Sequence, residues 1–153
     1  MNPSNPADAF VLDASVAAKW FVPHEAEPLT DQALGLLQLW DNATIAFVVP
    51  DLFWAEIGSV LAKAVRRGWI TAANGEEAIS RLRASNLPTV RCRQLIAEAF
   101  PMAVVRGSSL YDSVYVALAM RLQTSLITAD ERLVNTLGSR FPVRWLGSYP
   151  RGE

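Results

Sequence analysis

The sequence predicts an α/β fold in three layers, with a central, mainly parallel sheet covered by helices on both faces. The first observation is that short apolar runs of strand length alternate along the chain with stretches of helical periodicity. The second is that these runs are apolar enough for strands buried on both faces. The 153 residues show no repeat or linker, so one domain is expected over 1–153, with short flexible tails at 1–8 and 148–153.

The chain is expected to begin with a strand, two helices and a second strand. Residues 9–13, AFVLD, form an apolar run ended by an acid and predict a buried strand, and the helix formers after it continue up to Pro23. Residues 29–40 carry apolar side chains at helical spacing. Residues 44–50, TIAFVVP, predict a second strand stopped by Pro50.

Two further helices are predicted next. Residues 51–67 give the clearest helix, because their apolar stripe repeats at helical period and Gly68 is placed to cap the C-terminal end. Residues 71–85 predict another helix, with Thr71 as a possible N-cap. The segment 87–92, LPTVRC, is expected to be a weak third strand.

The last third of the chain repeats the alternation. Residues 93–105 are expected to be helical, although Pro101 should end or kink that helix. Residues 110–123 are apolar nearly all round, so this helix should be buried on more than one side. The chain should close with a strand ended by an acid, a short helix and a last strand, at residues 125–130, 130–138 and 142–146.

The charge of the chain leaves a nucleic-acid substrate open. Its 14 basic and 15 acidic side chains give a formal net charge of −1, which argues against a general nucleic-acid coat. If four acids converge in one pocket, 14 cations face the remaining 11 acids (15 less 4), and the outer surface is mildly basic. Hydrophobic residues make up 51%, which indicates a face covered by a partner.

A cytoplasmic protein is expected. The single cysteine, Cys92, excludes an intramolecular disulfide and a cysteine-based zinc cluster, and the lone His24 is interpreted as a solvated loop residue. The first residues lack the basic start and apolar run of a secretory signal. The apolar runs are too short to cross a bilayer, so no membrane association is expected.

Two acids stand at the ends of predicted strands, Asp13 after the first and Asp130 after the fourth. Because ligand sites of parallel sheets form at the carboxyl ends of the strands, these carboxylates are expected at the same edge. The alternative is that each caps the helix that follows it. Ser15 and Thr128, each two residues from one of these acids, are candidates to orient a carboxylate or a metal-bound water, or else bond the backbone.

Glu56 and Asp112 lie on predicted helices, with no cation within a helical turn. Glu56 is close to the apolar stripe of its helix and should be at least half buried, unless it turns outward at the core's edge. Asp112 also has a structural explanation, a capping box with Ser109. Buried, unpaired carboxylates are costly and repel one another. A hard cation, Mg²⁺ or Mn²⁺, is therefore expected among the four acids, which favours phosphoryl chemistry.

Four motifs then match a known family, in the order LDASVAAKWF, PDLFWAEIGSVLAKA, SSLYDSVYVALAMRL and LITADERL. Together they resemble the PIN-domain nucleases, in particular the VapC toxins of bacterial toxin–antitoxin modules, from Phe10 to about Trp145. The resemblance implies a PIN-like fold and a Mg²⁺-dependent endoribonuclease, usually dimeric, whose VapB-like antitoxin covers the active site with its tail. It places the catalytic, metal-binding acids and their supporting hydroxyls at Asp13, Glu56, Asp112, Asp130, Ser15 and Thr128.

Three other functions stay open at this point. A phosphatase or phospho-acceptor domain on a similar sheet would need a second acid near Asp13, but Ser15 stands two residues after it and only apolar residues directly precede it. An inactive PIN-fold scaffold would use the acids for structure or to bind a basic peptide. A PIN nuclease of RNA processing or DNA flaps is the third, although the compact chain lacks insertions for threading a flap.

The tryptophans indicate where a partner binds. Trp20, Trp40, Trp54 and Trp69 lie on or beside predicted helices, and aromatic side chains are favoured anchors at interfaces. Trp69 follows a basic turn where full burial is not expected, so Trp69 or Trp20 is predicted to contact an antitoxin helix; the alternative is core packing, accepted for Trp54. The four acids form a negative well, into which the antitoxin is expected to place an arginine.

Overall fold

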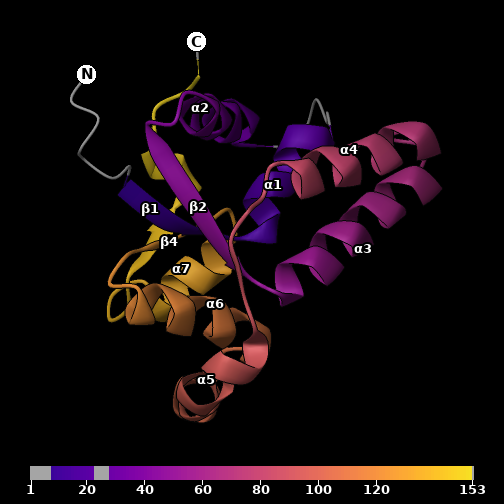
Figure 1. Ribbon diagram of the computed structural model, residues 1–153. Coiled ribbons are helices and arrows are strands. Elements are labelled where there is room, and N and C mark those ends of the chain that lie inside the picture. The colour runs from indigo at the N-terminus through magenta and orange to yellow at the C-terminus, as the bar shows by residue number, and fades with distance from the viewer. Residues whose placement is uncertain (1–7, 23–27, 153) are drawn as a thin grey trace.

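The computed structural model describes residues 8–22 and 28–152, and within them a five-stranded sheet flanked by helices (Figure 1). The strands are β1 (Asp8–Leu12), β2 (Ile45–Pro50), β3 (Thr89–Val90), β4 (Leu126–Thr128) and β5 (Val143–Trp145). The helices are α1 (Ala14–Phe21), α2 (Thr30–Asp41), α3 (Leu52–Arg66), α4 (Ala72–Ala84), α5 (Cys92–Arg106), α6 (Leu110–Arg121), α7 (Glu131–Leu137) and the short 3-10 helix η1 (Leu146–Ser148).

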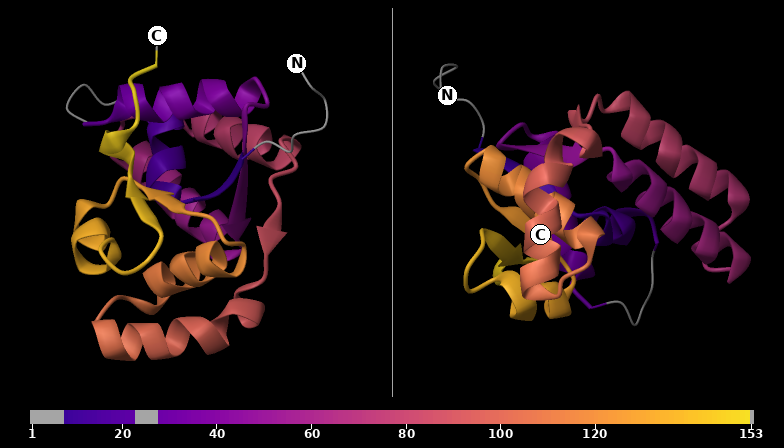
Figure 2. Two further views of the ribbon diagram at one scale, coloured as in Figure 1. Left: turned by 90° about the vertical axis from the view of Figure 1, so that its left-hand side faces the viewer. Right: turned by 90° about the horizontal axis from the view of Figure 1, so that it is seen from below.

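The strand order places the helices on two faces of the sheet. The order is β3-β2-β1-β4-β5 and every pairing is parallel, so the chain steps outward from β1 to β3 and then crosses back to β4 and β5. Because such crossovers are right-handed, α1 to α4 cover one face and α5 to α7 the other. In Figure 2, left, α2 and α5 lie on opposite sides of the strands. The predicted three-layer α/β fold is confirmed.

Most elements begin and end within two residues of their expected limits. Thr71 caps α4 as predicted, since the Asn74 N–H donates to its Oγ1 at 3.1 Å. The buried run 113–119 on α6 confirms that this helix is covered on more than one side. The weak third strand expected at 87–92 is only two residues long.

α5 differs from the expectation for its proline. The helix does not end at Pro101 but continues through it to Arg106 and stops at Gly107, whose φ of +68° is the left-handed conformation that favours glycine. Ala97, whose carbonyl loses its helical N–H partner to the proline, lies on the exposed side of the helix, where that carbonyl is open to solvent. Buried Leu95 and Met102 hold both halves of the helix against the protein.

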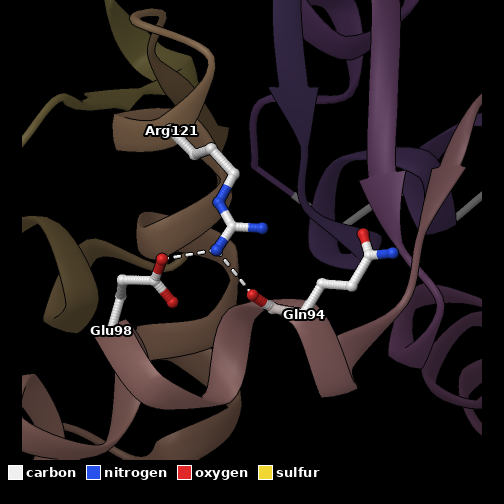
Figure 3. A network of polar contacts seen from close by, with 3 residues as sticks. All are labelled: Gln94, Glu98 and Arg121. Carbon is white, nitrogen blue, oxygen red and sulfur yellow. Dashed lines mark hydrogen bonds and ion pairs between the residues drawn. The ribbon is translucent and has the colours of Figure 1, made fainter.

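α5 packs along the outer side of α6. At the end of α6, the Arg121 guanidinium donates from Nη2 to the Gln94 carbonyl oxygen at 2.6 Å and pairs with the Glu98 carboxylate (Figure 3). An exposed ion pair of this kind contributes little stability, about 0 to 1 kcal/mol. Its contacts instead fix the register of α5 against α6, the helix that carries Asp112.

The C-terminal segment returns to α2. The Gly152 N–H donates to the Asp31 carbonyl at 2.9 Å, and a Cβ on Gly152 would come within 2.8 Å of the Gly35 nitrogen, so this close approach requires glycine. Of the expected tails, residues 1–7 and 153 lie outside the described residues, as do Pro23 and His24. Flexibility of the ends and the single-domain division stay predictions. Within the described ranges, every helix is too short or too polar to span a membrane.

Candidate active site

The centre of the sheet contains a topological switch point. β1 and β4 are neighbours, and the chain leaves β1 toward β2 but leaves β4 toward β5, in the opposite direction. Such a reversal opens a crevice at the carboxyl ends of the two strands. Asp13 follows β1 directly and Asp130 stands two residues after β4, so both acids lie at this edge.

Asp13 is buried at the crevice, with 7% of its surface exposed. As the N-cap of α1, its Oδ1 accepts a hydrogen bond from the Ser15 N–H at 3.4 Å. Its Oδ2 accepts one from the Thr128 hydroxyl at 2.6 Å. The capping alternative for Asp13 is confirmed, and it leaves the residue at the sheet edge.

Two hydroxyls link the ends of β1 and β4. The Thr128 Oγ1 accepts the Asp130 N–H at 3.0 Å, and the Ser15 Oγ accepts the Ala129 N–H at 3.1 Å. The two hydroxyl oxygens are 3.4 Å apart. Thr128 is fully buried, so this bridge fixes the Asp13 carboxylate relative to β4.

Asp112 and Asp130 both stand at helix N-termini beside the crevice. The Asp112 N–H donates to the Ser109 Oγ at 3.0 Å, the hydrogen bond expected of the predicted cap on α6. The Asp130 Oδ1 accepts the N–H of Arg132 at 3.0 Å and of Leu133 at 3.3 Å, which confirms that Asp130 caps α7. The two acids and Glu56 line one hollow of about 600 Å³.

Glu56 reaches this hollow from α3 and meets a residue that the sequence did not indicate. The Tyr115 hydroxyl, on α6, donates to the Glu56 Oε2 at 3.3 Å. Tyr115 is 1% exposed, and a buried phenol needs a partner for its hydroxyl. The sequence feature that could have indicated Tyr115 is its position, one helical turn after Asp112 in an otherwise apolar helix.

A cationic side chain lies among the acids. Arg132, from the first turn of α7, lines the same hollow, and its charge lowers the pKa of Asp112. The expectation that no lysine or arginine faces the acids was therefore wrong. The helical neighbours of Glu56 and Asp112 include no cation, whereas Arg132 comes from α7, two residues after Asp130.

The carboxyl groups influence one another through their charges. Burial, followed by the charge of Asp13, raises the pKa of Glu56 to about 7. Burial also raises the pKa of Asp13, against the lowering effect of its hydrogen bonds with Thr128 and Ser15. The pKa of Asp112 is raised by burial and by the charge of Asp130, against the lowering effect of the Ser109 hydrogen bond. These shifts indicate negative charge that is incompletely compensated.

The fit to a metal ion depends on how many ligands the protein must supply. In the part of the chain that the structure describes, no three His, Cys, Asp or Glu side chains are arranged as they stand to hold a metal. Asp130 is engaged in capping α7, and Tyr115 holds Glu56 toward α6. Mg²⁺ needs only one or two carboxylates, because it keeps several waters. The donor set therefore fits a hydrated divalent cation rather than a closed cage.

The two tryptophans proposed as partner contacts differ in their surroundings. The Trp20 indole N–H donates to the Ala33 carbonyl at 2.8 Å, and its ring lies 5.7 Å from that of Trp40 and 6.1 Å from that of Phe47, between centroids. Trp69 is 41% exposed, and the Arg67 Cζ lies 4.9 Å from the centroid of its ring. Neither touches the acidic hollow, but Trp69 lines a neighbouring groove that reaches Asp130.

The fold is a three-layer α/β domain with a parallel sheet, and acids from several elements lie near its switch point. These features define a class of α/β protein with an acidic site suited to binding a cation. The chain belongs to the PIN domain family, which matches residues 10–137. PIN ribonucleases are metal-dependent in general.

Similar proteins fall in the same family. Ribonuclease VapC3 from Pyrobaculum aerophilum is 29% identical over 125 residues, which cover 80% of this chain and 90% of that protein. Ribonuclease VapC9 from Mycobacterium tuberculosis is 36% identical over 98 residues, or 62% of this chain and 73% of that protein.

Two solved structures share the fold. PAE2754 from Pyrobaculum aerophilum matches with a TM-score of 0.67 and 20% identity, covering 93% of both chains. A toxin–antitoxin complex from Klebsiella pneumoniae matches with a TM-score of 0.61 and 16% identity, covering 88% of this chain and 95% of that one.

Proposed function

We propose that this chain is a metal-dependent endoribonuclease that acts as the toxin of a toxin–antitoxin pair. The observation that carries the proposal is the gathering of Glu56, Asp112 and Asp130 in one hollow of a PIN-family chain, with Asp13 close enough for its charge to act on Glu56. The names of the VapC ribonucleases that resemble it over most of their length support RNA as the substrate.

In this proposal the catalytic acids Asp13, Glu56, Asp112 and Asp130 hold Mg²⁺, with Mn²⁺ as a substitute. The ion, when bound, supplies an activated water and positive charge toward the scissile phosphate. Thr128 and Ser15 keep the Asp13 carboxylate oriented through their hydrogen bonds at the ends of β1 and β4.

Two further residues, Tyr115 and Arg132, support the chemistry of the acids. In the metal-free protein the pKa of Glu56 is raised to about 7, so a proton competes with a cation for this carboxylate near neutral pH. Tyr115 holds the Oε2 of Glu56 in place. Arg132 offers a cation at the rim of the hollow for a substrate phosphate.

The test is RNA cleavage in Mg²⁺ by the wild type and by Asp13→Asn, Glu56→Gln and Asp112→Asn. Each variant keeps its side-chain size and should lower the cleavage rate by about 100-fold or more, since even outer-shell partners of metal ligands contribute about 10- to 100-fold. Glu76→Gln, which removes an exposed acid of α4, is the control and should cut normally. A wild-type chain that cuts no RNA in either metal would favour the inactive scaffold instead.

The proposed protein partner is a VapB-like antitoxin. Trp69 or Trp20 contacts its helix, and its tail places an arginine among the acids, where a planar guanidinium binds two carboxylate oxygens. The charge of Arg132 already acts on Asp112, so Asp13 and Glu56 are the expected partners of the incoming cation. Changing that arginine to alanine should restore cleavage in a complex that still forms; full inhibition by the alanine variant would indicate steric blocking instead.

We further propose a homodimer that works in the cytoplasm, where its RNA is. Ile96, Phe100 and Val104 lie one turn apart along α5 and are 41%, 61% and 67% exposed. Such an apolar stripe suits a second copy of the chain. Phe100→Glu should shift the molar mass in solution from dimer to monomer, and an unchanged mass would move the interface elsewhere.

A further inference from the structure

Helices α1 and α3 pack against each other (Figure 1). Side chains of both helices line a groove beside the acidic hollow. Each helix lines it with one face: Ser15, Ala18, Lys19 and Val22 on α1 and just after it, and Val60, Lys63, Ala64 and Arg67 on α3 and just after it. In both helices these positions follow the spacing of one helical stripe. The groove holds about 310 Å³, at the lower end of the about 300 to 1,000 Å³ typical of small-molecule sites.

The groove joins the proposed active site at one end. Ser15 and Asp130 line that end, and Asp130 also lines the acidic hollow with Glu56 and Asp112. A molecule in the groove would therefore continue directly into the acidic site.

The charges of the groove are opposite to those of the hollow. Lys19, Lys63 and Arg67 line it, and Asp130 at its end is the one acid among its lining residues. Between the cations the walls are apolar, formed by alanine and valine side chains of the two helices. A ligand that matches this arrangement carries both negative charge and flat apolar surface.

Trp69 stands at the other end of the groove, in a position fixed by the end of α3. The Gly68 N–H donates to the Val65 carbonyl and the Trp69 N–H to the Ala64 carbonyl, both at 2.9 Å, and Gly68 has a φ of +73°. This is a Schellman motif, which is often accompanied by an apolar contact from the residue that occupies the Trp69 position. The motif explains an apolar residue there, but not a large aromatic ring that is 41% exposed and carries a guanidinium at 4.9 Å.

We propose that this groove binds one nucleoside of the RNA strand next to the scissile phosphate, with its base stacked on Trp69 and its phosphates held by Lys63, Arg67 and Lys19. The inference rests on the proposed ribonuclease function and names the subsite that positions its substrate. Single-stranded nucleic acids are bound in this way, by cations along the backbone and by aromatic rings under the bases. An RNA strand that runs from the groove into the hollow places its phosphates first beside the cations of the groove and then beside the acids of the hollow.

The test measures binding without cleavage, in EDTA, by the fluorescence anisotropy of labelled oligouridine and oligoadenine. Trp69→Leu keeps the apolar contact of the Schellman motif but removes the ring, and Trp69→Phe keeps a ring. The leucine variant should bind about 5-fold or more weakly, and the phenylalanine variant should stay close to the wild type. Urea unfolding of both variants shows that the fold is retained.

Two comparisons separate stacking from charge. An abasic ribose-phosphate oligomer of the same length has the charge without the bases, so wild type and Trp69→Leu should bind it equally. Lys63→Ala should reduce the slope of log Kd against log salt by about 0.7, the value for one phosphate contact on a single strand. Arg67→Ala should reduce this slope by the same amount. Its matched control is Arg144→Ala, which should leave the slope unchanged, since Arg144 also lies on an aromatic ring, 5.6 Å from the centroid of Phe10, but outside the groove.

The outcomes distinguish the subsite from the ribonuclease proposal. A wild-type chain that neither binds nor cuts RNA overturns both. A wild-type chain that cuts RNA, with Trp69→Leu binding each oligonucleotide as tightly as wild type, overturns the subsite alone. If Trp69→Leu loses affinity only for an antitoxin peptide, the groove belongs to the protein partner and the RNA subsite is also overturned.

Discussion

Glu56 is the residue whose surroundings most directly couple stability to pH. The unfolded chain releases the Glu56 proton near the ordinary value of 4.5, whereas the folded protein keeps it up to a pKa of about 7. The contribution of Glu56 to the stability of the metal-free protein should therefore be fully present below the lower value, be lost as pH rises between the two values, and not change further above them. The raised pKa values of Asp13 and Asp112 act in the same direction.

The first prediction is that Glu56→Gln flattens this pH dependence. At about pH 8 the variant should be about 1 to 2 kcal/mol more stable than the wild type, less than the full shift implies, because the side chain is partly solvated. Urea unfolding of the metal-free proteins at about pH 5 and about pH 8 measures the difference. Glu76→Gln, on an exposed part of α4, should keep the wild-type slope; equal slopes for all three proteins would contradict the prediction.

The second prediction concerns Tyr115→Phe, which removes the hydroxyl but keeps the buried ring. The hydrogen bond from Tyr115 lowers the pKa of Glu56, so without it that pKa should rise further. The acid limb of the pH–rate profile for RNA cleavage should move to higher pH, with a rate lower by about tenfold at neutral pH. Tyr149→Phe, which removes a hydroxyl outside the acidic hollow, is the control. A Tyr115→Phe profile that overlies the wild type would remove Tyr115 from a positioning role.

At the level of elements, the end of α3 depends on one backbone conformation. Gly68 has a φ of +73°, and a Cβ placed there would meet no atom within 4 Å, so only the backbone conformation disfavours a side chain. Gly58, in the middle of α3, also has open space around its Cβ position but no left-handed φ. The two glycines therefore form a matched pair.

The third prediction is that alanine has opposite effects at these two positions. Gly68→Ala should destabilise the protein by about 1 kcal/mol or more, and Gly58→Ala should stabilise it by about 0.5 to 1 kcal/mol. Shifts of the urea midpoint in opposite directions would support this reading of the helix end. Because the Trp69 position follows from the same turn, Gly68→Ala should also weaken RNA binding, and unchanged binding would separate the turn from the groove.

At the scale of the whole molecule, the fold brings together acids whose negative charge a divalent cation would neutralise. Burial, and to a smaller extent the charges of neighbouring acids, raises the pKa values of Asp13, Glu56 and Asp112, so their ionised forms destabilise the metal-free fold. A ligand that binds only the folded state stabilises it by mass action.

The fourth prediction is that Mg²⁺ or Mn²⁺ raises the thermal midpoint of the wild type by several degrees. At a hundredfold excess over Kd the expected gain is about 2.7 kcal/mol. Asp13→Asn should have a higher midpoint than wild type in EDTA, because repulsion is relieved, and a much smaller rise with metal. Calorimetry of wild type, Asp13→Asn and Glu76→Gln makes the comparison; an equal metal response in Asp13→Asn would place the cation elsewhere.

Local sequence determined most of the elements and the position of the acids along the chain. Periodicity and caps act within a few residues, so Thr71, Gly68 and Ser109 could be assigned from their neighbours. The alternation of strands and helices predicts the parallel sheet, and a parallel sheet brings Asp13 and Asp130 to one edge. At Pro101 local sequence left open whether the helix ends or kinks, and the helix continues because the preceding turn is exposed, which depends on how α5 packs on α6.

The tertiary structure decided which groups meet across elements. Tyr115 reaches Glu56 and Arg132 reaches the hollow of Asp112 from other helices, and no spacing rule covers pairs so far apart along the chain. The groove of Lys19, Lys63 and Trp69 likewise exists only because α1 and α3 pack side by side. Sequence periodicity fixes which face a helix buries, but strand order and crossover hand fix what that face meets, and the surroundings of each charge follow from those.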